Sequence, residues 1–186
     1  RQDGTTWGVP LALKCVALYV NLDLVKTDWT RLDLEGLAAI QGLPADVYPL
    51  AYEVKGAYGH MPLLLGLGGR MLTDDQQYAF IGPAAESSLA LAKQLVDQGA
   101  VPGDADGALV QELFKSGRAA FAISGPWLAS NLQGAALRYR LAGYEEMIQA
   151  LEAAEGSSQL ALEATLPAQG LKTYAVHVLR PSHGPY

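Results

Sequence analysis

The sequence has little of several features that mark particular classes of protein. Cys15 is the only cysteine, so no disulfide can form within the chain. The longest strongly apolar stretches, at 13–20 and 61–69, fall well short of the ~20 residues that a membrane-spanning helix needs. The thirteen Lys and Arg residues are scattered through a chain of net charge -6. Because binding to nucleic-acid phosphates needs clustered positive charge, we expect a soluble chain with no nucleic-acid partner.

Arrangements of side chains for catalysis or metal binding are also missing from the sequence. The histidines have no metal-ligand spacing with one another or with the cysteine. The adjacent pairs Asp74-Asp75 and Glu145-Glu146 cannot oppose each other across a substrate as a general acid and base do. Ser124 lacks the flanking glycines of a nucleophile elbow. We therefore expect no catalytic residues, no metal and no cofactor, and a protein that is not an enzyme.

What the sequence does contain is a regular alternation of apolar runs and helix signals. Half of the 186 residues are hydrophobic, which is enough to bury a sizeable core. Short apolar runs typical of buried strands alternate with amphipathic segments, and this order is typical of a layered α/β domain. The sequence predicts a three-layer α/β lobe with central strands near 9–20, 47–54, 118–124 and 171–179.

The first two helices are predicted from cap residues and from proline. In 26–40, Thr27 or Asp28 can cap a helix whose apolar residues lie roughly on one side. In 57–69, Pro62 is placed at the start of a helix that ends at a pair of glycines.

The next two helices have clearer ends. The third lies within the segment 83–101 and ends at Gly99. The fourth begins at Asp104 or Asp106 and ends at Gly117. Spacing predicts that the buried face of the third helix carries Leu89, Ala92, Leu95 and Val96.

Beyond residue 132 the pattern changes. The segment 136–143 reads as a strand, 144–156 as an acidic amphipathic helix and 169–181 as a final strand. The segment 157–168 between them fits a helix or an irregular connection equally well.

Three segments carry a family resemblance: "TWGVPLALKCVALYVNLDLV", "YEVKGAYGHMPLLLGLGG" and "LFKSGRAAFAISGPWLASNL". In this order they resemble the maltose and maltodextrin-binding proteins of bacterial ABC importers over about residues 5–132, and the third is the most specific. Members of that family are two-lobed clamshells with a periplasmic binding protein fold. The resemblance implies that 1–186 is a single lobe, with 1–132 similar to the family's C-terminal lobe and 133–186 a divergent tail that completes it. The opening "RQDGTTWGVP" lacks an initiator methionine and a signal-peptide pattern, so we expect a mature fragment or an excised domain.

The resemblance also implies sugar-binding residues. Sugar sites pair aromatic faces with a few hydrogen-bonding groups. Trp127 lies where the family has a stacking tryptophan, and Tyr58 where it has a second aromatic contact. Lys14 stands in place of one acidic sugar contact, and Lys55 or Gly56 in place of another. From the residues alone, Trp127 fits a core tryptophan and Tyr58 a surface tyrosine.

Two functions follow from the resemblance. In the first, the chain is a periplasmic or extracytoplasmic module with weak or no sugar binding of its own. Its partners would be an importer permease, other domains of a parent chain, or a second copy in a homodimer made by exchange of the tail. In the alternative, it is the sugar-binding lobe of a maltodextrin-binding protein whose second lobe is missing from this chain.

Overall fold

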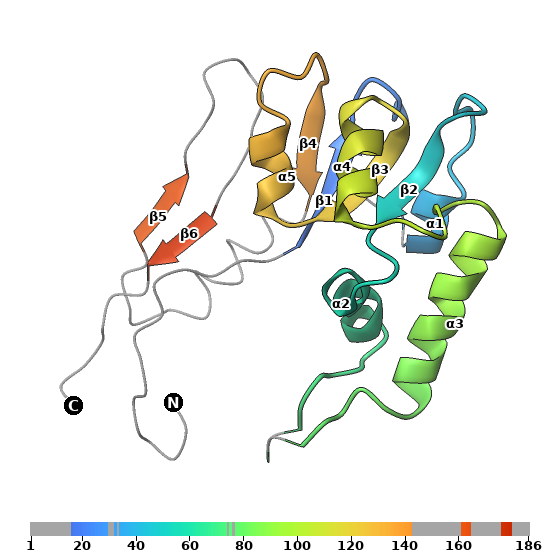
Figure 1. Cartoon of the computed structure of the whole chain (residues 1–186), viewed down its shortest axis with the longest axis vertical. Helices are drawn as coiled ribbons and strands as arrows, with labels where there is room; N and C mark the ends of the chain where they lie inside the picture. The colour runs from blue at the N-terminus through green and yellow to red at the C-terminus, as the bar shows by residue number, and fades with distance from the viewer. Residues whose placement is uncertain are drawn as a thin grey trace.

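A computed structural model describes residues 16–29, 32, 34–73, 75 and 77–142, together with the backbone of two strands at 161–164 and 176–179. Its main sheet is four-stranded, in the order β2-β3-β1-β4 (Figure 1). Strands β2 and β3 are parallel, whereas β1 is antiparallel to both β3 and β4. The sheet is therefore mixed. Its strands are β1 (Ala17–Asn21), β2 (Tyr48–Tyr52), β3 (Ala119–Ser124) and β4 (Tyr139–Ala142).

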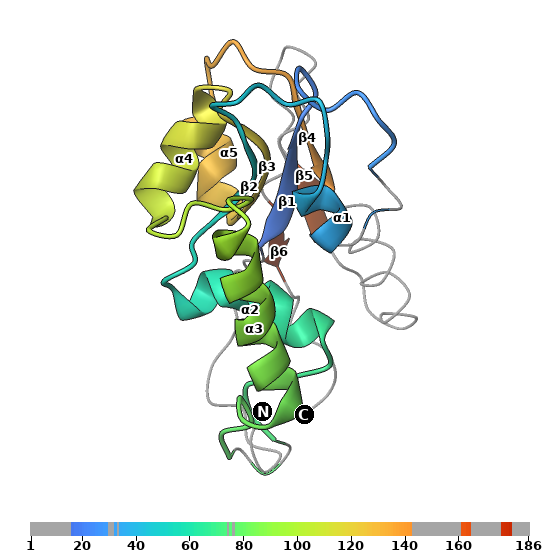
Figure 2. The same cartoon turned by 90° about the vertical axis from the view of Figure 1, so that its right-hand side faces the viewer.

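Helices cover both faces of this sheet. They are α1 (Leu34–Ala38), α2 (Ala57–Gly66), α3 (Pro83–Asp97), α4 (Gly107–Lys115) and α5 (Pro126–Asn131). With the sheet seen from its side in Figure 2, α4 and α5 lie on one face and α1 lies on the other. Among the described residues, none of these helices is long and apolar enough to cross a membrane.

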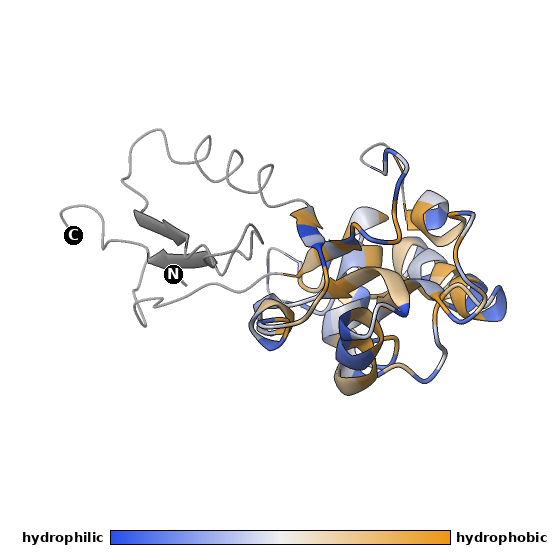
Figure 3. Cartoon of the chain, turned by 90° about the horizontal axis from the view of Figure 1, so that it is seen from above, coloured by the Kyte–Doolittle hydropathy of each residue, from blue (hydrophilic) through white to orange (hydrophobic). Residues whose placement is uncertain are grey.

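Two buried clusters, one on each face of the sheet, hold the layers together. On one face, Phe114 of α4 and Leu128 of α5 pack with Tyr19 of β1. On the other face, Leu95 of α3 packs in a cluster with Val20, the next residue of β1. The helices in Figure 3 carry both hydrophobic residues (orange) and hydrophilic residues (blue), as expected for helices with one buried and one exposed side. The predicted three-layer α/β lobe is confirmed.

The predicted ends of α3 and α4 are confirmed by their backbone geometry. The side chain of Asp106 accepts a hydrogen bond of 2.8 Å from the backbone N–H of Leu109, so Asp106 caps α4. Gly99 and Gly117 follow α3 and α4 with φ values of 69° and 73°. Side chains disfavour that left-handed conformation, which explains a glycine at each position.

The first two helices begin at residues other than those predicted. Helix α1 begins at Leu34, and neither Thr27 nor Asp28 caps it. After β1 the chain first makes a turn, in which the backbone N–H of Val25 donates to the carbonyl of Asn21 at 2.9 Å. Helix α2 begins at Ala57, so Pro62 lies inside the helix and not at its start.

The predicted buried face of α3 is wrong at one position. Leu89 is 62% exposed, while the neighbouring Ser88 is fully buried. The Ser88 hydroxyl donates a hydrogen bond of 2.8 Å to the carbonyl of Ala85. Because this bond satisfies the hydroxyl inside the protein, a polar residue can occupy a position where periodicity favours an apolar one. Leu95 is buried as predicted, and Ala92 and Val96 pack against the same cluster.

The predicted central strand at 171–179 is also wrong. Strand β6 (Val176–Leu179) pairs antiparallel with β5 (Ala161–Ala164) in a separate two-stranded sheet. The edge of the main sheet beside β1 is taken by β4, which confirms the strand predicted at 136–143. Strands β5 and β6 are close in sequence, so their pairing closes only a short loop. Residues 161–164 within the segment 157–168 form strand β5, and neither of the two interpretations of that segment included a strand. The helix predicted at 144–156 lies outside the described residues.

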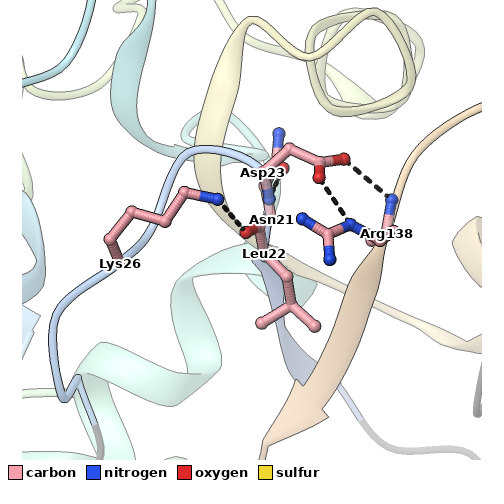
Figure 4. A network of polar contacts seen from close by, with 5 residues as sticks. All are labelled: Asn21, Leu22, Asp23, Lys26 and Arg138. Atoms are coloured by element: carbon pink, nitrogen blue, oxygen red, sulfur yellow. Dashed lines mark hydrogen bonds and ion pairs between the residues drawn. The ribbon is translucent and has the colours of Figure 1, made fainter.

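A polar network joins the end of β1 to the start of β4 (Figure 4). The Asp23 carboxylate accepts hydrogen bonds from the backbone N–H of Arg138 at 3.1 Å and from its Nε at 2.7 Å. The backbone bond, more than the guanidinium bond, lowers the pKa of the Asp23 carboxyl. Asn21 accepts from the backbone N–H of Asp23 at 2.9 Å, and Lys26 donates to the carbonyl of Leu22 at 2.8 Å. These bonds fix where the two strands meet.

Tyr52 of β2 is expected to be more stable as phenylalanine. It is fully buried, and its hydroxyl has no hydrogen-bond partner in the described structure. Burial raises the pKa of Tyr52 to about 12. Because an unsatisfied buried hydroxyl costs ~1–3 kcal/mol, Tyr52→Phe should raise the free energy of unfolding by about 1 kcal/mol in urea titrations.

Tyr19→Phe is the matched control for that substitution. The Tyr19 hydroxyl donates a hydrogen bond of 2.8 Å to the carbonyl of Gly125, so removing it should lower the free energy of unfolding by about 1 kcal/mol. If both variants lose stability to the same extent, the Tyr52 hydroxyl is satisfied in solution.

Candidate functional site

Trp127 lies at the edge of the lobe, in the first turn of α5. Strand β3 ends at Ser124, Gly125 follows in an extended conformation, and Pro126 opens the helix. The carbonyl of Gly125 is held by the hydroxyl of Tyr19. Trp127 itself is 42% exposed, so it is not a core tryptophan.

Tyr58 lies beside Trp127 although the two residues come from different helices. It is in the first turn of α2, which precedes the helix start predicted at Pro62, and it is 43% exposed. The two ring centroids are 5.7 Å apart and the rings are tilted by 41°. This distance is within the range of favourable aromatic pairs. The structure thus brings the two predicted aromatic residues together with part of each ring open to solvent.

A shallow hollow surrounds this aromatic pair. Besides the Tyr58 hydroxyl and the Trp127 indole N–H, its lining has polar groups on Glu53 and Ser124. The enclosed space is only about 10 Å³, which is room for about one water molecule. The hollow is therefore one wall of a site and not an enclosed pocket. Its lining comprises Val16, Glu53, Tyr58, Gly59, Gly107, Val110, Ile123, Ser124, Gly125 and Trp127.

Glu53 is the site residue that sequence reasoning missed. It directly follows β2, and Ser124 ends β3, the parallel neighbour of β2. Tyr52 pairs with Ile123 in the sheet register, so the residues after them meet at the same edge. Because the carboxyl ends of parallel strands gather at one edge, a polar residue directly after a buried strand is the signal that could have identified Glu53.

Of the two predicted lysines, only Lys55 lies within the described residues. Lys55 is exposed in the turn before α2 and does not line the hollow. Lys14 lies outside the described residues. Gly56 has a steric role, because a Cβ there would overlap the carboxylate of Glu53. The carboxylate at this wall thus comes from Glu53, three positions before the glycine.

A second surface feature is an apolar groove of about 190 Å³ between α2, α3 and the segment joining them. Met71, Phe80 and Leu89 contribute apolar lining, and His60 contributes an imidazole. His60 Nε2 lies 2.9 Å from the Ser88 hydroxyl, and it donates to that hydroxyl in the tautomer that preserves the bond from Ser88 to Ala85. Burial lowers the pKa of His60. In the described part of the chain, no three His, Cys, Asp or Glu side chains gather as a metal site requires.

Gly125→Ala is expected to separate the two rings of the aromatic pair. A Cβ at this position would lie 2.7 Å from Cε3 of Trp127 and closer still to two other ring atoms. Since a tryptophan side chain can rotate, the ring should turn away at a cost below about 1 kcal/mol. We expect altered near-ultraviolet circular dichroism and Trp127 fluorescence with nearly unchanged stability. Spectra identical to wild type would contradict the observed ring position.

Comparisons with known proteins identify the family of this chain and a matching fold. The family described as bacterial extracellular solute-binding protein matches residues 1–180. The maltodextrin-binding protein MdxE of Bacillus subtilis is 30% identical over 154 residues, which cover 74% of this chain and 36% of that protein. The fold matches a crystal structure of a cyclo/maltodextrin-binding protein complexed with maltotetraose, with a TM-score of 0.64 and 22% identity. That match covers 76% of this chain and 39% of the other.

This chain therefore spans between a third and two fifths of the length of these two relatives. Its match to the family extends well beyond half of its own residues. The chain belongs to the bacterial extracellular solute-binding proteins.

Proposed function

We propose that this chain forms one wall of a maltodextrin-type sugar site. The observation that carries the proposal is the exposed pair of Tyr58 and Trp127 beside the carboxylate of Glu53. Sugar rings have apolar C–H patches that stack on aromatic faces, and their hydroxyls donate hydrogen bonds to carboxylates. The site therefore offers both kinds of contact within one hollow. The name of the Bacillus relative supports maltodextrin as the sugar.

The affinity of the chain alone should be low. A typical small-molecule site encloses most of its ligand, whereas this hollow covers only one side of a sugar. We expect dissociation constants in the millimolar range, equivalent to no more than about 4 kcal/mol. A second lobe would provide the opposite wall of the site. The two lobes together would act at the extracytoplasmic face of an importer.

Titration with maltose and maltotriose, followed by tryptophan fluorescence and calorimetry, tests this function. Weak saturable binding is expected in the wild-type chain, and Trp127→Ala should abolish it because the stacking face is removed. Trp29→Phe is the control, since Trp29 lies under Arg140 at 5.8 Å and outside the hollow. An unchanged titration in Trp127→Ala would remove Trp127 from the site, and micromolar binding would contradict the one-wall geometry.

An accessory module that associates with a second copy of the chain is the second candidate. The exposed side chains around the α2 and α3 groove favour it, because Tyr78 and Ile81 are each 75% exposed. Apolar surface of this kind often marks a protein interface. Light scattering at several concentrations should then show a dimer that Ile81→Asp dissociates. A monomeric mass throughout would exclude this candidate.

A further inference from the structure

The Glu53 carboxylate is the only charged group that the described structure places in the lining of the hollow. Within the described residues it makes no hydrogen bond or ion pair, and no Lys, Arg or His shares the lining with it. A carboxylate can accept several hydrogen bonds and prefers a cation or strong donors nearby. Its bonding capacity is therefore available to a ligand.

Neighbouring glycines and helix ends fix the position of the Glu53 carboxylate. One carboxylate oxygen lies against Gly56, the N-cap of α2, and the other faces Gly107, the first residue of α4. A Cβ at Gly107 would be 3.8 Å from Oε2. The N-terminus of α2 places partial positive charge beside the first of these oxygens, whereas the N-terminus of α4 already carries the capping carboxylate of Asp106. Gly59 also packs against the backbone of Glu53 and restricts its movement.

The two aromatic rings that line the same hollow add a second preference for positive charge. Aromatic faces attract cations, and the open sides of Tyr58 and Trp127 border the same hollow as Glu53. An ammonium group on a sugar would meet both the carboxylate and a ring face. A carboxylate on a sugar would instead be repelled by Glu53.

We propose that this wall selects sugars by charge, with Glu53 favouring a sugar that carries a protonated amine over a neutral sugar and disfavouring an acidic one. This inference rests on the proposed sugar site and specifies the class of sugar that it takes. It assigns Glu53 the role of a specificity-determining residue.

Matched monosaccharides test the charge preference. Glucosamine and 6-amino-6-deoxyglucose carry the amine at different edges of the ring, glucose is neutral and glucuronate is anionic. Each is titrated into the full 186-residue chain at mildly acidic pH, with the Trp127 indole N–H followed by NMR and assigned by its loss in Trp127→Phe. At least one amine should bind about fivefold more tightly than glucose, and glucuronate more weakly than glucose.

Glu53→Gln should abolish both differences because it keeps the shape and removes the charge. Glu86→Gln, which removes an exposed charge at the start of α3, should retain them. The preference should also shrink when salt rises from about 20 mM to about 200 mM. Equal binding of amines and glucose, or a preference that persists in Glu53→Gln, would overturn this inference while binding of maltotriose upheld the sugar site. If no sugar binds at all, maltotriose included, both the site and its charge preference are overturned.

Discussion

Replacing Phe114 by alanine should lower the free energy of unfolding by about 3–5 kcal/mol, as is typical for deleting a buried phenylalanine ring. Phe114 is fully buried in α4. Its ring meets Tyr19 of β1 edge to face at 5.9 Å and Tyr139 of β4 at 6.3 Å. Loss of the ring would remove contacts between one helix layer and two strands at once. Urea unfolding followed by circular dichroism gives the measurement.

Leu89→Ala is the control for the Phe114 substitution. Leu89 is 62% exposed on α3, so its truncation should change the free energy of unfolding by less than about 0.5 kcal/mol. Since small domains are stable by only ~5–15 kcal/mol, the two variants should differ visibly in their unfolding midpoints. A loss below about 1 kcal/mol in Phe114→Ala would contradict the close packing of α4 on the sheet.

Gly59→Ala should destabilise the protein, although alanine is the better helix former. Alanine gains about 1 kcal/mol of helix propensity. At Gly59, however, the new Cβ would lie 2.9 Å from the Cβ of Glu53 and would overlap its carbonyl oxygen. Backbone cannot move aside as a flexible side chain can, and overpacking of this kind costs ~1–3 kcal/mol or more. We expect a net loss of about 1–2 kcal/mol, with sugar binding weakened because Glu53 is displaced.

Gly66→Ala isolates the propensity term on the same helix. A Cβ there meets no atom within 4 Å, and Gly66 is not one of the glycines with a positive φ. We expect a gain of up to about 1 kcal/mol from this substitution. If Gly59→Ala also gained stability, the close contact between α2 and Glu53 would not exist in solution.

Local signals predicted much of this fold. The cap at Asp106 and the glycines after α3 and α4 depend on neighbouring residues, so the sequence contains what is needed to predict them. The strand partners were harder to predict, because pairing depends on distant segments. The apolar run at 171–179 indicated a strand correctly, but apolarity does not specify which sheet a strand joins.

The candidate site illustrates the same limit. Tyr58 and Trp127 were identified through the family resemblance, since nothing in their own spacing indicates that they meet. Glu53 was missed because its position depends on the parallel pairing of β2 with β3, which periodicity does not reveal. Leu89 and Ser88 show that one hydrogen bond can reverse the choice between two neighbouring positions on a helix.

The central place of β1 in the main sheet has a consequence for the order of folding. The hydroxyl of Tyr19 reaches a carbonyl 106 positions later, and Asp23 bonds a residue 115 positions later. While the chain is being synthesised, β1 emerges long before either of its partner strands exists. Contacts between such distant segments slow folding and leave apolar edges exposed in the meantime. A nascent chain of this protein would therefore need its β1 segment shielded until β3 and β4 have been made.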